Sequence, residues 1–408
     1  MFWFIRSFAA LVLAFLIGQS SLPSRLEKAE EPVETPPVAR DISLECFFNG
    51  QSGQHHNLTD GNYAKVFKTG SKDHARALRI TTPEGEVAGA IYIQWNTLPL
   101  PLNIQTETPE GEWVTVAECD GDFFAQYCPV PDLSDFRIVC RDDPMKQLAI
   151  CELKVLTPGT PPEGIQVWQK PGGKVDLMLL AGHPDDELLW FGGLLPYYAG
   201  ELGKNVLVIT AAMNRPLRRL ELCDALWACG VRTHPIHVVR FDFSTTDMHS
   251  VLSKWGGEEQ MKEIYTEYIR KYKPDVLVLQ DIYGEYGHGI HKAVSWLGRE
   301  CSVLAADSSA YPEQAREWGT WDVPKIYIHL YPENQLQMNW DVPLSNFGGK
   351  TAFDVAAEAM LQHKSQVEHG WALTPGGEMD NSLFGLYKTL VGPDVEKNDF
   401  FEHLSPPE

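Results

Sequence analysis

The sequence predicts an α/β protein with a Rossmann-like, doubly wound and mostly parallel sheet, preceded by a smaller all-β sandwich. Two observations predict this class. Between residues 41 and 157, short strand-like segments are separated by turns such as Pro83-Glu84-Gly85, a pattern typical of antiparallel sandwiches. Beyond a proline-rich boundary at 157–162, near-continuous apolar strands alternate with helical stretches, which is typical of a parallel sheet covered on both faces.

Residues 1–20 have the layout of a secretory signal peptide, with Arg6 ahead of an apolar run at 8–17. That run is shorter than the roughly 20 residues of a membrane-spanning helix, although retention as an N-terminal anchor stays open. A linker is expected at 21–40, which is dense in proline and glutamate. We therefore expect a secreted or cell-surface protein without further membrane insertion.

The charge of the chain restricts its partners. The 408 residues include 34 Lys and Arg against 55 Asp and Glu, a formal net charge of −21. With no basic run to offset it, this charge repels nucleic-acid backbones and anionic membranes, so neither is expected as a partner. The expected partner is a small saccharide or glycan, and the oligomeric state is left open.

The chain has eight cysteines, and export would permit disulfides. Five precede the boundary at 157–162, so at most two bridges form there and one thiol is left over. Cys223 and Cys229 lie six positions apart on an expected helix, a rise of about 9 Å, which is too long for a bridge. Both are expected to be buried thiols. The five earlier cysteines are Cys46, Cys119, Cys128, Cys140 and Cys151.

The first domain is expected at 41–157. Residues 58–62 and 148–155 resemble discoidin-type, galactose-binding-like modules, and the resemblance implies carbohydrate binding. Aromatic side chains are the candidates for stacking on a sugar, but a place in the core is the favoured interpretation for aromatic residues on alternating strands. The candidates are Trp95, Trp113, Phe123 and Phe124. The expected strands are 77–81, 88–95, 102–106, 113–117, 136–140 and 148–156.

The second domain is expected at 165–408. No G-x-G-x-x-G follows its first strand, so a dinucleotide site is not indicated. Its expected strands are 175–180, 205–211, 236–241, 275–280 and 325–330. Its expected helices are 188–200, 216–229, 258–272 and 291–304.

The first strand of this domain ends on His183-Pro184-Asp185-Asp186-Glu187. If the turn winds into a helix, His183 and Asp186 share a face and can point at one ion, while Asp185 points elsewhere. Ligands bind beyond the carboxyl ends of strands in open α/β sheets, which is where this turn lies. The alternative is that the acids only cap a helix, which accounts for one Asp.

A glycine-rich loop after the fourth strand carries His288 and His291 at a helix start. Adjacent strands would bring His183, Asp186 and His291 together. Two imidazoles and a carboxylate with an open fourth position form a typical catalytic zinc ligand set. The alternative for each histidine is a satisfied polar residue. We expect Zn²⁺, with Fe²⁺ possible because histidine and carboxylate ligands suit both ions.

Several motifs of this domain resemble the LmbE/PIG-L family of zinc-dependent deacetylases of N-acetylglucosamine conjugates, so 165–408 is expected to be an LmbE/PIG-L-like deacetylase domain. The resemblance spans roughly residues 175–403. The motifs are residues 181–187, Gly192-Gly193, Arg218-x-x-Glu221, Tyr286-Gly287-His288-x-x-His291, His363-x-Ser365-Gln366 and residues 381–387.

The resemblance implies metal ligation by His183, Asp186 and His291, with Asp185 as the general base that activates water. It also implies that His288 stabilises the oxyanion of the tetrahedral intermediate and that Tyr286 assists. These roles suit amide hydrolysis, which needs a nucleophile at neutral pH and donors where negative charge develops.

Three other positions of the motifs, Arg218, Glu187 and the residue before His291, bear on substrate binding and on the support of the ligands. Arg218 is the candidate substrate-binding residue, with a surface ion pair to Glu221 as the alternative. Glu187 is expected to cap or orient the turn. The family usually has an acid just before its last histidine ligand, whereas this chain has Gly289-Ile290, so a carboxylate supporting His291 is expected to be missing.

The sequence therefore predicts a metal-dependent hydrolase that removes the acetyl group from N-acetylated amino sugars and releases acetate. The alternatives are hydrolysis of another small amide or acylated sugar, and a catalytically silent secreted glycan-binding protein.

Overall fold

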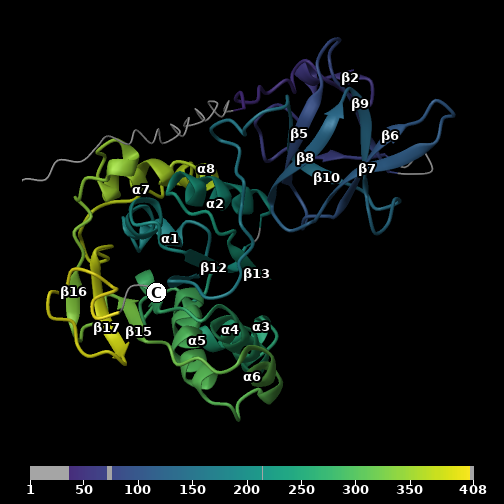
Figure 1. Ribbon diagram of the computed structural model, residues 1–408. Coiled ribbons are helices and arrows are strands. Elements are labelled where there is room, and N and C mark those ends of the chain that lie inside the picture. Colours follow the sequence, from purple (N-terminus) through teal and green to yellow (C-terminus); the bar gives the residue numbers. More distant parts are fainter. Residues whose placement is uncertain (1–35, 71–75, 214, 405–408) are drawn as a thin grey trace, which may run out of the picture. The chain divides into compact units, whose positions relative to one another are not determined.

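The computed structural model describes residues 36–70, 76–213 and 215–404 (Figure 1). The expected signal peptide at 1–20 and most of the expected linker lie outside these residues. The described residues from Pro37 onward belong to one compact unit. The prediction of a mixed α/β chain with several sheets is confirmed. Among the described helices, none combines the length and the apolar character needed to cross a membrane.

The first region consists of two antiparallel sheets. One has the strand order β2-β1-β4-β9-β6-β7 and the other β3-β10-β5-β8. Their bounds are β1 Phe47–Phe48, β2 Gln51–Ser52, β3 Phe67–Lys68, β4 Leu78–Thr81, β5 Ala88–Trp95, β6 Leu102–Glu107, β7 Trp113–Cys119, β8 Ala125–Leu133, β9 Asp135–Cys140 and β10 Ala149–Leu156, with a 3₁₀ turn η1 at Gly53–His55.

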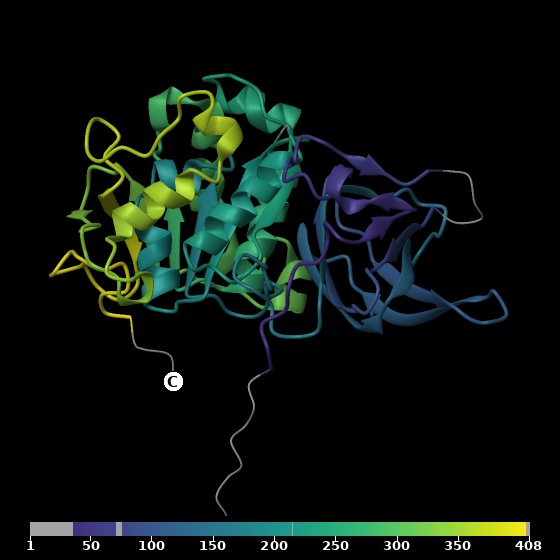
Figure 2. The ribbon, with the colours of Figure 1, turned by 90° about the horizontal axis from the view of Figure 1, so that it is seen from above.

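The two antiparallel sheets share one hydrophobic core, and Figure 2 shows their purple and blue strands packed together. Alternate residues point inward, as Leu78 and Ile80 of β4 do, because successive side chains of a strand face opposite sides. Trp95 and Phe124 are buried, which confirms the core interpretation for both. Trp113 and Phe123 are partly exposed.

All six expected strands of the first region are present, but the two-residue strands β1, β2 and β3 and the nine-residue strand β8 were not predicted from the sequence. Strand β8 contains Pro129 and Pro131, and proline interrupts the sequence pattern of a strand because it has no N–H to donate. The structure resolves the conflict by placing β8 at the edge of its sheet, where only one side pairs with a neighbour, β5.

The second region contains a seven-stranded sheet with the order β13-β12-β11-β14-β15-β17-β16. The pairs from β13 to β15 are parallel, while β17 pairs antiparallel with both β15 and β16. The bounds are β11 Leu177–Ala181, β12 Val206–Ala212, β13 Ile236–Arg240, β14 Val276–Leu279, β15 Lys325–His329, β16 Gln335–Gln337 and β17 Leu383–Thr389.

Helices cover both faces of this sheet, as Figure 1 shows. Along β11, Leu177 and Leu179 belong to a core with α1, α2 and α7, whereas Met178 and Leu180 belong to a core with α3, α4 and α5. The bounds are α1 Asp186–Leu189, η2 Pro196–Glu201, α2 Leu217–Ala228, α3 Met248–Lys254, α4 Glu258–Tyr272, η3 Glu285–Gly287, α5 Gly289–Ala306, α6 Pro312–Trp318, η4 Ser345–Phe347, α7 Ala352–Met360 and α8 Lys364–Val367.

The prediction of one helix at 188–200 is wrong. The stretch 188–200 is not a single helix, because α1 ends at Leu189 and a separate π-helical turn, η2, begins at Pro196. Gly192 lies between them with φ +52°, and a Cβ there would lie 2.7 Å from Trp340 Nε1. The chain turns at this glycine so that Trp340 can pack against it.

The order of the parallel strands reverses between β11 and β14. From β11 the chain moves outward to β12 and β13, then returns to the other side of β11 to form β14 and β15. Where a parallel sheet reverses in this way, the loops after the two central strands diverge to opposite faces and leave a crevice at the carboxyl edge. The loop after β11 carries His183, and the segment after β14 leads to His291.

The described residues contain one disulfide, Cys119–Cys128, and the other six cysteines are buried thiols. This confirms the expectation of free, buried thiols at Cys223 and Cys229. The disulfide joins the end of β7 in one antiparallel sheet to β8 in the other, nine residues further along. It therefore links the two sheets across their shared core.

We expect that replacing both bridging cysteines, Cys119→Ala with Cys128→Ala, lowers the free energy of unfolding by roughly 2–3 kcal/mol, the loop-closure value for a bridge of this span. Chemical denaturation of the full chain measures the loss. A strong reductant should destabilise the wild-type protein by a similar amount and leave the double variant unchanged. Equal stability of the two proteins under oxidising conditions would contradict this role.

Candidate metal centre

The turn after β11 brings its polar side chains close to the backbone of Gly182. The Gly182 N–H donates to Gln280 Oε1 at 2.8 Å, which ties the end of β11 to the residue that follows β14. A Cβ at position 182 would lie 2.9 Å from His291 Cδ2 and 3.0 Å from Asp186 Oδ2. Glycine is therefore required here, because any larger residue would push the two loops apart.

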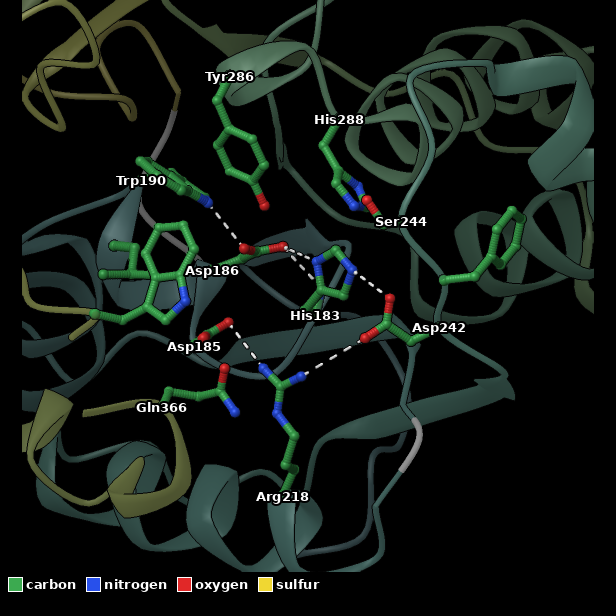
Figure 3. Close-up of a pocket in the computed structure, with 13 residues that line it drawn as sticks. His183, Asp185, Asp186, Trp190, Arg218, Asp242, Ser244, Tyr286, His288 and Gln366 are labelled. Carbon is green, nitrogen blue, oxygen red and sulfur yellow. Dashed lines mark hydrogen bonds and ion pairs between the residues drawn. The ribbon is translucent and has the colours of Figure 1, made fainter. Parts of the chain in front are cut away.

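Three side-chain atoms from these two loops meet at the carboxyl edge of the sheet. His183 Nδ1 lies 3.1 Å from His291 Nε2, and Asp186 Oδ2 lies 3.2 Å from each of these nitrogens. All three residues are buried. Figure 3 shows the imidazole of His183 and the carboxylate of Asp186 pointing toward one another at the base of a pocket. The structure thus brings together the three residues that the sequence predicts as metal ligands.

The donor set fits a divalent transition metal. Ligand atoms about 2.0–2.1 Å from a tetrahedral zinc ion lie about 3.4 Å from one another, close to the separations found here. His288 extends the group, since His183, His288 and His291 each offer a nitrogen and these nitrogens lie within 4.8 Å of one another. Two sets of three ligands are therefore available, one with Asp186 and one with His288.

The hydrogen bond made by His288 favours the set with Asp186. His288 is the N-cap residue of α5, and its Nδ1 accepts the backbone N–H of Ile290 at 3.3 Å. An imidazole that accepts at Nδ1 carries its hydrogen on Nε2, which makes Nε2 a donor rather than a free ligand. Burial and the neighbouring charges of His183 and His291 lower the pKa of His288 to about 4. His288 is therefore arranged to donate a hydrogen bond into the pocket.

A carboxylate supports His291, contrary to the sequence-based expectation that it would be missing. Glu285, in the glycine-rich loop, makes an ion-pair contact of 2.9 Å with His291 Nδ1 and another of 2.8 Å with His329 Nδ1. Gln280 Nε2 donates to Glu285 Oε2 at 3.1 Å and to Asp186 Oδ2 at 3.2 Å. Burial alone would raise the pKa of Glu285, but its contacts with the two histidines outweigh burial and hold the pKa at about 2.

A second carboxylate, Asp242, orients His183 in the same way. Its Oδ1 lies 3.2 Å from His183 Nε2, opposite the nitrogen that faces Asp186. Carboxylates behind ligand histidines fix the ring orientation and the tautomer. Sequence reasoning missed Asp242 and Glu285, although both lie just after strands of the parallel sheet, β13 and β14. That position was the signal that could have identified them.

Asp185 lies beside the three converging atoms but does not join them. Its backbone has φ 113° and ψ −29°, which turns it away from the face that Asp186 occupies. Arg218 Nη2 lies 3.2 Å from Asp185 Oδ1. Burial raises the pKa of Asp185 to about 7, although the charge of Arg218 opposes the shift. The two neighbouring acids are thus held in different environments, as the spacing predicts.

Arg218 is buried and lines the pocket, so its interpretation as a surface ion pair with Glu221 is wrong. Its guanidinium also donates to Pro184 O and approaches Asp242 Oδ2 to 3.9 Å. Glu221 instead accepts the backbone N–H and the hydroxyl of Ser365, at 2.8 and 2.6 Å. The helix α2 therefore reaches the site through Arg218 and the C-terminal segment through Glu221.

The pocket above these residues has a volume of about 270 Å³ and an aromatic rim. Tyr286 and Trp371 are 47% and 38% exposed, and their rings lie 5.8 Å apart. The ring of Trp190 lies 5.8 Å from that of Tyr286 and 6.3 Å from that of Trp371, and its Nε1 donates to Asp186 Oδ1 at 2.8 Å. Figure 3 shows the hydroxyl of Tyr286 pointing into the pocket, beside His288. The arrangement combines a polar floor with flat apolar walls, which suits a sugar ring.

The PIG-L family profile, described as GlcNAc-PI de-N-acetylase, matches residues 178–302. A 1D-myo-inositol 2-acetamido-2-deoxy-alpha-D-glucopyranoside deacetylase of Catenulispora acidiphila is 27% identical over 188 residues, which are 39% of this chain and 57% of the relative. The enzyme of that name from Streptomyces avermitilis is 24% identical over 290 residues, 56% of this chain and 97% of the relative.

Among solved structures, the N,N'-diacetylchitobiose deacetylase of Pyrococcus horikoshii is 16% identical with a TM-score of 0.37, and the match covers 47% of this chain and 70% of that one. The chain spans little more than half the length of the Catenulispora relative, 57%. The match to the family profile includes both loops that carry the converging side chains.

We expect the purified chain to hold one equivalent of divalent metal, and Asp186→Asn and His291→Ala to lose it after dialysis. Loss of a direct ligand should weaken metal binding by more than the 10- to 100-fold that loss of a supporting group costs. The matched variant His288→Ala should keep its metal, since its Nδ1 already caps α5. Elemental analysis measures the stoichiometry. Equal metal loss in His288→Ala and His291→Ala would place His288 in the ligand set.

Proposed function

We propose that the chain is a PIG-L-type, metal-dependent hydrolase that removes the acetyl group from N-acetylated amino sugars, a proposal supported by the family match over residues 178–302. One observation carries this proposal. His183, Asp186 and His291 converge within 3.1–3.2 Å, and Asp185, whose carboxylate takes no part in that convergence, lines the same pocket. This is the division of roles that hydrolysis of an amide requires.

In the proposed assignment His183, Asp186 and His291 hold the metal ion, with Zn²⁺ the favoured identity and Fe²⁺ the alternative. The ion would polarise the amide carbonyl and lower the pKa of water to about 7. Glu285 and Asp242 orient the two histidines from behind, through contacts of 2.9 and 3.2 Å. Gln280 links Asp186 to Glu285, so the ligands and their supports form one connected network.

The remaining residues carry out the proton transfers and bind charge. Asp185 takes a proton from water as the water oxygen attacks the acetyl carbon. His288 donates from Nε2 to the carbonyl oxygen as negative charge develops there, with the Tyr286 hydroxyl on the same side of the pocket. The carbon–nitrogen bond then breaks, and Asp185 returns the proton to the departing nitrogen. The products are acetate and a free amine. Arg218 holds the Asp185 carboxylate and reaches the pocket as a polar contact for substrate.

The test is release of acetate from a panel of N-acetylated saccharides, with Asp185→Asn as the first variant. Asn is isosteric with Asp but cannot accept the proton, so we expect kcat to fall by about 10²–10⁴ while metal content stays unchanged. His288→Ala, which removes a donor to the oxyanion, should cost about 10²–10³ in kcat. Undiminished acetate release by Asp185→Asn would remove the general base from the proposal.

The panel also separates the alternatives. Turnover of other amides or acylated sugars, without release of acetate from any N-acetylated saccharide, would favour a different hydrolase that uses the same centre. A chain that binds glycans but holds no metal and shows no turnover would favour the glycan-binding protein.

We infer that the substrate extends beyond a single sugar ring. A second cavity of about 240 Å³ adjoins the first and shares Arg218, Asp242, Gln366 and Trp371 with it. Trp371 therefore stands between the two cavities, with 38% of its surface exposed. This position would let its ring stack on the sugar or ring that follows the N-acetylated one.

If so, Trp371→Ala should raise KM for an N-acetylated disaccharide by up to about tenfold, the effect of losing a stacking contact of about 1.4 kcal/mol. The monosaccharide should be almost unaffected, and kcat should change little for either. Steady-state kinetics with the matched pair of substrates measures the difference. An equal rise in KM for both would mean that Trp371 serves the first ring instead.

We also propose the fold class of each region, the location of the protein and a ligand for the first region. The parallel order β13-β12-β11-β14-β15, with helices on both faces, supports a Rossmann-like doubly wound layout for the second region. The shared core of the two antiparallel sheets supports a β-sandwich for the first.

The Cys119–Cys128 disulfide supports a secreted or cell-surface location, because such bonds persist in oxidising compartments. Carbohydrate binding by the first region would fall to Trp113 and Phe123, its partly exposed candidates.

A further inference from the structure

The backbone of Asp185 adopts a conformation that the rest of the site must hold in place. A φ of 113° is rare for a residue with a side chain, and such strained positions cost of order 1–3 kcal/mol. They persist only where neighbouring groups fix them. Arg218 contacts Asp185 through its carboxylate, so a contact that fixes the backbone has to come from another residue.

Glu187 supplies that contact. Its Oε2 accepts the Asp185 N–H at 2.7 Å, so the Glu187 side chain points back toward the residue two positions earlier. Its Oε1 lies 2.7 Å from His363 Nε2. Glu187 and His363 are both fully buried, at 0% exposure. The backbone of Asp185 is therefore connected through one carboxylate to an imidazole 176 residues further along than Glu187.

The segment that carries His363 is itself fixed. His363 precedes the short helix α8, and its N–H donates to Met360 O at the end of α7. Two residues later, both the N–H and the hydroxyl of Ser365 donate to the buried carboxylate of Glu221. His363 is thus held on a rigid turn and presents Nε2 to Glu187. Its Nδ1 has no hydrogen-bond partner among the described residues, so the contact with Glu187 is the interaction that orients the imidazole ring.

We propose that His363, acting through Glu187, is a positioning residue that holds Asp185 in the geometry of a general base. This inference rests on the function proposed above. Buried ion pairs contribute little net stability compared with apolar residues of similar size, so stability alone does not account for this one. The geometric effect of the pair accounts for it instead. Glu187 holds the N–H of Asp185, and the backbone conformation fixed in this way determines where the Asp185 carboxylate points.

The variants Glu187→Gln and His363→Ala should lower kcat by about 10- to 100-fold, the cost of a misplaced catalytic group, and leave KM and metal content nearly unchanged. His363→Gln retains an N–H donor at the position of Nε2 and should recover part of the lost rate. A control for general loss of packing is Tyr198→Phe, which removes the hydrogen bond that the hydroxyl donates to Asp399 and the one that it accepts from the Phe400 N–H. That variant should lower the melting temperature and leave kcat unchanged.

A double variant separates positioning from a merely structural role. If His363 and Glu187 act through Asp185, adding Glu187→Gln to Asp185→Asn should cause almost no further loss of rate, because the group that they position is already inactive. Additive losses, or wild-type kcat in both single variants, would overturn the proposal.

If the wild-type chain releases no acetate, the proposed function fails by itself. The positioning role is then decided by crystal structures of Glu187→Gln and His363→Ala. A φ at Asp185 that leaves the region near 113° supports the role, and an unchanged φ overturns it.

Discussion

The site depends on one carboxylate oxygen that joins two loops distant in the sequence. Asp186 Oδ2 accepts the backbone N–H of His183 at 2.7 Å and lies 3.2 Å from His291 Nε2, which comes from beyond β14. β11 and β14 are direct neighbours because the strand order reverses between them, so their loops must meet. Gly182 is the residue that lets them meet closely enough. Without this reversal, His183 and His291 would follow strands that are not neighbours, and the donor set would not form.

The same turn gives adjacent acids different roles by backbone geometry alone. Asp186 begins α1 and faces inward, while the left-handed conformation of Asp185 directs its carboxylate toward Arg218. Each buried acid of the site is matched by a cation or a histidine, since removing one partner of a buried pair costs about 3–5 kcal/mol. Glu187 has His363, and Glu285 has two histidines. A chain with a net charge of −21 can thus bury Asp185, Asp186, Glu187 and Glu285 together, because each has a cationic or histidine partner.

Much of this arrangement could be predicted from local pattern. The apolar runs predicted the strands β11 to β15 to within two residues at each end. The helical pattern predicted the helix at Glu258–Tyr272 with the bounds that the structure shows. His183, Asp186 and His291 could be grouped because both loops follow neighbouring strands. The contribution of His363 could not be predicted, because it depends on a contact with Glu187, 176 residues away in the sequence. Local pattern also failed at 188–200, where a single helix was expected but Gly192, with φ +52°, lies between α1 and η2.

The support behind His291 shows how a fold can provide a group that the local motif lacks. The acid expected next to this histidine is absent, yet Glu285, six positions earlier, contacts its Nδ1. The loop allows this because Gly284 and Gly287 have φ of 69° and 77°, and Tyr286 has φ 43°. A Cβ at Gly284 would lie 2.5 Å from the His288 carbonyl oxygen. These glycines bend the loop sharply, so that Glu285 points inward while Tyr286 remains at the rim.

The bend therefore determines two properties of the site together. Turning Glu285 inward gives His291 a carboxylate partner, which fixes the ring with Nε2 directed at Asp186. Leaving Tyr286 outside, 47% exposed, provides one wall of the pocket and a hydroxyl directed into it. A side chain at Gly284 would disturb both, because the backbone could no longer reverse between the acid and the phenol. The glycine-rich loop is thus required for the geometry of the histidine and for the shape of the pocket.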